Sequence, residues 1–220
     1  MREDSTAGTT PEQLRQLRTP DALALADLTA ASEELAKVAG CCEQILTLSG
    51  QERTSTRDLL VESLWTTALL SYRRCFCAER STTVLTTDDL ADTNLRGDVL
   101  QWHNTLEKLR EHYVDTRLNP RENFVAGAAQ DAAGHANGVA VTSAPQPELD
   151  DTTVRQTGQL AVELGRIVDE RISTRQQALY ESARSMNPQN LASLPRIQVS
   201  QPEGDIPVSQ QQQPEGDESH

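Results

Sequence analysis

Basic side chains gather in one segment of an otherwise acidic chain. Lys108, Arg110, Arg117 and Arg121 place four positive charges within fourteen residues, whereas the whole chain has a formal net charge of −13. Guanidinium groups bind phosphate and carboxylate oxygens through paired, charge-assisted hydrogen bonds. The segment therefore indicates either a site that binds RNA, a nucleotide or a protein partner, or a solvated helix face with internal ion pairs.

Two histidines lie on the same predicted helix as Arg110. His103 precedes Arg110 by seven residues, and His112 follows it by two. Histidine titrates near neutral pH and can move protons for a phosphate that an arginine holds. Seven residues are two helical turns, so His103 shares a face with Arg110 but reaches it only after a rearrangement. Arg110, His103 and His112 are the candidate catalytic residues, and their candidate polar neighbours are Asp115, Thr116 and Asn119.

The remaining reactive residues do not form a recognisable catalytic or metal site. The four cysteines come as one adjacent pair, Cys41 and Cys42, and one C-x-C, Cys75 and Cys77, and neither spacing matches the C-x-x-C pairs of zinc sites. On a helix, Cys75 and Cys77 point about 200° apart. Phosphate loops, H-E-x-x-H and nucleophile elbows are absent from the sequence. We therefore expect buried structural thiols, no metal and no cofactor.

Three features together resemble the bacterial HEPN-like helical proteins. The first is the aromatic and basic segment LWTTALLSYRRCF (64–76). The second, LREHYVDTRLNP (109–120), is similar to the family pattern Leu-Arg-x-Lys-x-hydrophobic-Ala-His-Ser-x-Asn. The third is a hairpin-like insert followed by a long closing helix. Together the three features cover roughly residues 55–186.

The resemblance implies a metal-independent RNA-cleaving pair in active members, an arginine with a histidine a few residues later. Carried over to this chain, the arginine is Arg110, and the histidine position falls on Thr116, with Asp115 just before it. Threonine cannot act as a base at pH 7. The resemblance therefore implies a non-catalytic interaction module in a stress, phage-defence or toxin–antitoxin setting. A ribonuclease acting through Arg110 and a structural or scaffold helical protein are the alternatives.

A second basic cluster, Arg73 and Arg74, lies near the end of the preceding predicted helix. If the helices pack as the resemblance implies, we expect one of these arginines to pair with Asp115 or Glu111 in an internal salt bridge. RNA or partner binding is the alternative role. The residues that would share it are Lys108, Arg117, Arg121, Arg73 and Arg74.

Hydrophobic periodicity predicts the elements that position these residues. Helices are expected from Thr19-Pro20 to about Leu48 and from about Asp150 to Met186. Another is expected to begin at about Ser55, with an apolar stripe that consists of Leu60, Leu64, Ala68, Tyr72 and Phe76. A third helical region, capped at Thr87, is split near Gly97. Only 3% of residues are aromatic, which favours helices. The expected fold is mainly α: an antiparallel bundle of about four main helices, with a small β-hairpin inserted before the last.

The inserted hairpin is predicted from two short apolar runs, Phe124–Ala129 and Val139–Thr142, which are separated by glycine, Asp131 and Asn137. An isolated two-stranded hairpin is marginally stable in water. We therefore expect this hairpin to pack on the helices.

Composition divides the chain into a flexible segment 1–18, a helical domain 19–186 and an acidic, Pro/Gln-rich tail 187–220 that repeats QPEGD. Such a tail buries too little apolar surface to order itself. The sequence has neither a run of about 20 apolar residues nor a signal-peptide core, which predicts a cytoplasmic protein that does not bind membranes. The expected partner is another protein or a second copy, through the apolar faces of the second and last helices.

Overall fold

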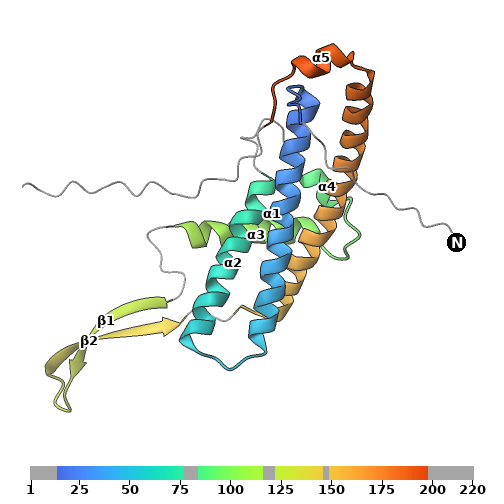
Figure 1. Ribbon diagram of the computed structural model, residues 1–220. Helices are drawn as coiled ribbons and strands as arrows, with labels where there is room; N and C mark the ends of the chain where they lie inside the picture. The colour runs from blue at the N-terminus through green and yellow to red at the C-terminus, as the bar shows by residue number, and fades with distance from the viewer. Residues whose placement is uncertain (1–13, 77–83, 116–121, 146–148, 198–220) are drawn as a thin grey trace, which may run out of the picture. The chain divides into compact units, whose positions relative to one another are not determined.

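A computed structural model describes residues 14–76, 84–115, 122–145 and 149–197 (Figure 1). They belong to two compact units, residues 18–185 and the segments on either side of them. The described residues of the larger unit form four long or medium helices, one 3-10 turn and a two-stranded antiparallel hairpin before the last long helix. The predicted mainly helical class, with a hairpin inserted before the last long helix, is confirmed.

Helix α1 (Pro20–Ser49) begins and ends where local capping predicts. The Thr19 hydroxyl accepts a hydrogen bond from the Ala22 N–H (3.2 Å), and Pro20 occupies the first helical position. Gly50 follows the last turn. The buried face of α1 contributes to the core the residues Leu28, Ala31, Leu35, Val38, Cys42 and Ile45.

Helix α2 (Ser55–Cys75) is buried along its second half. Its buried face carries Trp65, Ala68, Leu69, Tyr72 and Cys75. Leu60, which the sequence placed on the apolar stripe, is 47% exposed instead. The prediction was wrong at this position because the first two turns of α2 lie outside the buried core.

Helix α4 (Asp151–Ser185) packs along α1. Asp150 caps it by accepting from the Thr153 N–H (2.9 Å). Its first half buries Val154, Leu160, Leu164 and Val168, whereas most side chains after Ile172 are exposed. The two helices approach closely at Gly158, where an added Cβ would lie 3.2 Å from the Cys42 Cβ.

The region between α2 and the hairpin divides into a 3-10 turn, η1 (Thr87–Leu90), and helix α3 (Val99–Val114). Gly97, with φ +100°, lies between them, as the sequence predicted. The N-cap of η1 is Thr86, not the predicted Thr87, because the Thr86 N–H donates to the Asp89 carboxylate (2.7 Å). Asp98 caps α3 by accepting from the Gln101 N–H (2.8 Å).

Strands β1 (Glu122–Gln130) and β2 (Ala136–Pro145) form the predicted hairpin. Every side chain that the structure describes from 124 to 144 is exposed. The expectation that the hairpin packs on the helices of the same chain was therefore wrong.

The smaller unit contains a short helix, α5 (Pro188–Ser193), capped by the Asn187 side chain. A bridge joins Arg15 to Arg196, and the Gln16 N–H donates to the Pro195 carbonyl (2.8 Å). The prediction that the chain is disordered from residue 187 was thus wrong for 187–197. Residues 198–220 lie outside the described part.

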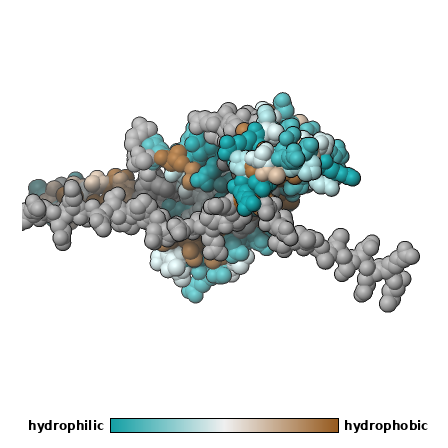
Figure 2. Space-filling view, turned by 45° about the horizontal axis from the view of Figure 1, so that its top comes forward, coloured by the Kyte–Doolittle hydropathy of each residue, from teal (hydrophilic) through white to brown (hydrophobic). Residues whose placement is uncertain are grey.

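Among the coloured residues in Figure 2, polar (teal) side chains predominate, and apolar (brown) residues occupy smaller areas. Within the described residues, no helix combines the length and the apolar character that crossing a membrane requires.

Candidate functional site

The predicted catalytic helix, α3, turns one face toward α2. His103 and Leu106 are its buried residues, and Arg110 follows one turn after Leu106 with 26% of its side chain exposed. Lys108 is exposed on the outer side. The face that carries His103 and Arg110 is therefore a packing face between two helices.

His103 is held in an aromatic cluster with α2. Its Nδ1 lies 2.8 Å from the Tyr72 hydroxyl, and its ring centroid lies 4.6 Å from that of Phe76. Burial lowers the pKa of His103, and the Arg73 charge lowers it further while Glu107 opposes the shift. The imidazole is thus neutral at pH 7 and hydrogen-bonded inside the protein.

The arginines of α2 are engaged in ion pairs that differ from the predicted ones. Arg73 Nε lies 3.2 Å from the Glu107 carboxylate, and Arg74 Nη1 lies 3.4 Å from the Glu34 carboxylate on α1. The prediction that one of these arginines pairs with Asp115 or Glu111 was wrong. The reason is the α2–α3 register, which sets Arg73 opposite the middle of α3 and not its end.

Arg110 does not meet either histidine. Its Nη2 lies 3.7 Å from the Glu111 carboxylate, and its Nε is buried without a hydrogen-bond partner among the described residues. His112 instead packs its ring against the edge of Tyr113, with centroids 5.9 Å apart. The structure thus places the three candidate catalytic residues on one helix without bringing them together.

The other predicted site residues divide into two groups. Lys108 is exposed and has no ion pair within the described residues, and the Asp115 N–H closes α3 by donating to the Glu111 carbonyl (3.1 Å). Thr116, Arg117, Asn119 and Arg121 lie outside the described residues.

The cysteines that the structure describes are separate structural thiols. Cys41, Cys42 and Cys75 are buried and form no disulfide with one another, and burial raises the pKa of Cys42 to about 12. Over the described parts of the chain, no group of three or more acidic, histidine or cysteine side chains is arranged to hold a metal ion.

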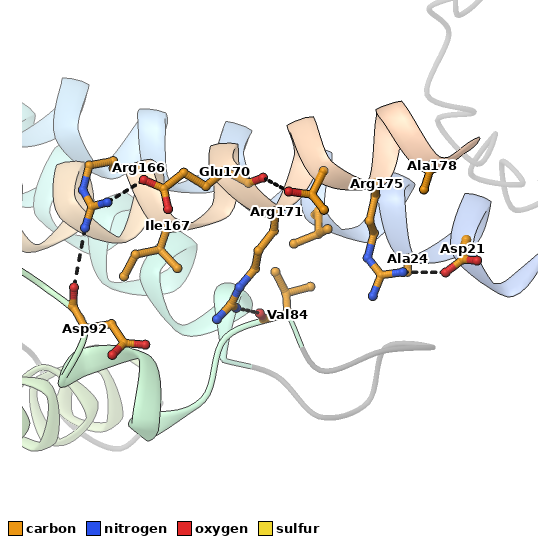
Figure 3. A pocket seen from close by; sticks show the side chains of 12 residues that line it. Asp21, Ala24, Val84, Asp92, Arg166, Ile167, Glu170, Arg171, Arg175 and Ala178 are labelled. Carbon is orange, nitrogen blue, oxygen red and sulfur yellow. Dashed lines mark hydrogen bonds and ion pairs between the residues drawn. The ribbon is translucent and has the colours of Figure 1, made fainter. Parts of the chain in front are cut away.

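A second polar site, which the sequence analysis missed, is a pocket of about 900 Å³ beside α1 and α4. Figure 3 shows Arg166, Arg171 and Arg175 of α4 reaching toward its walls. Arg166 pairs with Glu170 (2.7 Å) and Arg175 with Asp21 (2.6 Å). Each of these guanidinium groups is therefore partly neutralised by a carboxylate.

Arg171 makes the most buried of these ion pairs. Its guanidinium binds the Asp89 carboxylate. It also donates to the Val84 carbonyl (3.0 Å; Figure 3). Burial by itself would raise the pKa of Asp89, but the hydrogen bonds from Arg171 and Thr86 outweigh it and lower that pKa below its ordinary value. This contact fastens the segment after α2 to α4 and is structural in character.

Helical spacing could have indicated part of this pocket, because Arg171 and Arg175 are four residues apart on one row of α4. Their partners, Asp89 and Asp21, lie 82 and 154 positions earlier in the chain. Only the packing of the helices shows that these groups meet.

Comparison of the chain with protein-family models, with characterised proteins and with solved structures finds no match.

Proposed function

We propose that this chain is a non-catalytic helical interaction module of HEPN-like type. The observation that carries the proposal is the state of His103, which is 6% exposed and hydrogen-bonded to Tyr72. A general base must reach the proton that it removes, and this imidazole is enclosed between two helices. With threonine at position 116, Arg110 lacks the histidine of the family pattern as well.

The charges on α2 and α3 support protein interaction over RNA binding. Arg73, Arg74 and Arg110 each lie within 4 Å of a carboxylate, at 3.2, 3.4 and 3.7 Å. Phosphate binding depends on cations that are free to replace the counterions of the nucleic acid. Of the described basic candidates, Lys108 alone has no ion pair with another described residue, and the chain as a whole has a net charge of −13.

Helices α2 and α3, joined by the His103–Tyr72 and Arg73–Glu107 contacts, would then serve as a frame that presents the outer surface of the bundle to a protein partner. A stress, phage-defence or toxin–antitoxin setting is the context that the resemblance implies. The Arg110-dependent ribonuclease and the purely structural helical protein are the competing functions.

An RNA cleavage assay in EDTA tests the proposal. The purified chain, Arg110→Ala and the double variant Asp115→Ala/Thr116→His, which restores the Ala-His of the family pattern, are incubated with single-stranded RNA. We expect no cleavage by the first two proteins. Cleavage by the double variant that disappears when Arg110→Ala is added would support the HEPN-like resemblance, and its failure to cleave would count against it.

Binding of labelled RNA is measured in parallel at about 50 and 200 mM salt, where contacts to several phosphates would change affinity by orders of magnitude. Cleavage by the unmodified chain that is lost in Arg110→Ala would overturn the proposal in favour of a ribonuclease. Tight, salt-sensitive binding without cleavage would overturn it in favour of an RNA-binding protein.

A further inference from the structure

A smaller pocket, of about 400 Å³, is lined by the segment before α3, the first turns of α3 and the first part of α4. Its apolar wall consists of Leu95, Val99, Trp102 and Leu160. Leu160 is fully buried, and Trp102 is partly buried against the core. A pocket of this volume, with an apolar wall and several polar side chains, is typical of sites that bind small molecules.

Most polar side chains of this pocket share one shape. Gln101, Gln156 and Gln159 end in amides, Asp98 ends in a carboxylate and Arg96 ends in a guanidinium. Each of these groups is planar and carries polar atoms side by side. A planar fork can bind two neighbouring oxygen atoms at once. The pocket therefore favours a ligand that presents pairs of adjacent oxygens.

These groups are not occupied by one another. Arg96 and the three glutamine side chains make no hydrogen bond or ion pair with another described residue. Asp98 caps α3 with one carboxylate oxygen (2.8 Å). The indole N–H of Trp102 is buried and has no acceptor among the described residues. In the larger pocket, by contrast, all three arginines are paired with carboxylates.

The charges around the smaller pocket indicate an uncharged ligand. Among the described residues that line it, Arg96 and Asp98 alone are charged, and they balance. An anion would be repelled by the remaining chain, with its net charge of −13, and a cation would meet a guanidinium beside the single carboxylate. Amides both donate and accept hydrogen bonds, as hydroxyl groups do. The polar side of the pocket therefore suits a ligand rich in hydroxyl groups.

We propose that this pocket binds the ring of an uncharged mono- or disaccharide. Hydroxyls on adjacent ring carbons present pairs of oxygens to the planar side chains Gln101, Gln156 and Gln159. The C–H face of the ring lies against the apolar wall, where Trp102 offers the largest flat surface. The site is independent of the proposed function, because it uses none of the α2–α3 contacts on which that function rests.

Isothermal titration calorimetry and tryptophan fluorescence of the full chain test the site. The probes are glucose, galactose, mannose, N-acetylglucosamine, maltose and lactose, each up to about 50 mM, which detects weak binding. Trp102 is one of two tryptophans, and the other, Trp65, is 1% exposed in the core. We expect at least one sugar to give saturable heat together with a change in emission.

Gln156→Ala/Gln159→Ala removes two amides from exposed positions of the pocket and should weaken that binding about tenfold or more. The matched control is Gln176→Ala/Gln177→Ala, which removes two amides from exposed positions further along α4. It should bind like the unmodified chain. Far-UV circular dichroism verifies that the helices of both variants are intact.

The same sugars coupled to agarose separate two sources of the ring. Retention of the chain supports a ring at the end of a glycan, and binding without retention supports a free sugar. The absence of heat and emission change with every sugar would overturn the proposal. Equal binding by the two double variants would also overturn it, because the sugar would then bind elsewhere. Tighter binding of glucose 6-phosphate than of glucose would overturn it in favour of an anion site.

Discussion

The ion pair between Arg171 and Asp89 should be a main support of the segment that joins α2 to α3. The Asp89 side chain is 8% exposed and that of Arg171 is 38% exposed. The same Asp89 carboxylate accepts from the Thr86 N–H (2.7 Å), so one buried group both caps η1 and anchors it to α4. Removing Arg171 would leave that carboxylate with Thr86 as its remaining donor.

The variant Arg171→Met keeps much of the length of the side chain and removes its donors. Breaking a fully buried pair costs about 3–5 kcal/mol. Because Arg171 is partly exposed, water can replace some of its hydrogen bonds, and we expect a loss of about 2 kcal/mol in the free energy of unfolding. For a chain of this size that corresponds to a fall in Tm of about 4–8 °C.

Urea and thermal unfolding measure the contribution of this ion pair to the free energy of unfolding. The proteins compared are the unmodified chain, Arg171→Met, Asp89→Asn and the double variant. The double-mutant cycle should give a coupling free energy of about 1–2 kcal/mol. Arg166→Met is the control, because Arg166 is 41% exposed and its carboxylate partners, Glu170 and Glu163, lie on its own helix. Such i,i+4 and i,i+3 pairs contribute about 0.2–0.5 kcal/mol each.

The free energy of unfolding that Arg171→Met loses relative to the unmodified chain should decrease in acid. The pKa of Asp89 is lower in the folded chain than in the unfolded chain, so its contribution is fully present above the unfolded pKa of about 3.9. The difference should be constant above about pH 5 and shrink as the pH falls through the folded pKa. A Tm change below about 1 °C, or a difference that grows in acid, would refute this account of the contact.

Two further variants test other parts of the core. Tyr72→Phe removes the hydroxyl that hydrogen-bonds to His103, and urea unfolding should show a loss of about 1–3 kcal/mol in the free energy of unfolding. Tyr180→Phe, at an exposed position, should cause no measurable loss. Equal effects of the two variants would refute the buried pair. Gly165→Ala, which meets no atom within 4 Å, should stabilise α4 by about 0.5–1 kcal/mol, but Gly158→Ala should not, since its Cβ would crowd α1 at 3.2 Å. Equal stabilisation by both alanines would contradict the close α1–α4 contact.

The helix ends could be predicted because their causes are local. Thr19 with Pro20 begins α1, and Gly50 ends it, through capping interactions that span only a few residues. The cap at η1 was misplaced by one residue because two adjacent threonines can both serve. Asp89 decides between them, and it does so as part of a contact with α4 that no local pattern contains.

The candidate site could be predicted only in part. Helical spacing correctly put His103 and Arg110 on a common face, but whether that face points to solvent or to another helix depends on tertiary packing. The partner of His103 is Tyr72, 31 positions earlier. The same limit explains Leu60, which has the right spacing for the core and lies on a part of α2 that extends beyond it.

The packing of α3 on α2 also bears on the ribonuclease alternative. For His103 to serve Arg110 as a base, α3 would have to separate from α2 and break the bond to Tyr72, which costs about 1–3 kcal/mol. Separation would also expose Leu106 and Phe76, now 1% and 9% exposed, at about 1.5–3 kcal/mol each. These costs add to about 4–9 kcal/mol, which leaves fewer than about one molecule in 10³ in the open state. Any rate that depends on a displaced His103 is reduced by at least that factor.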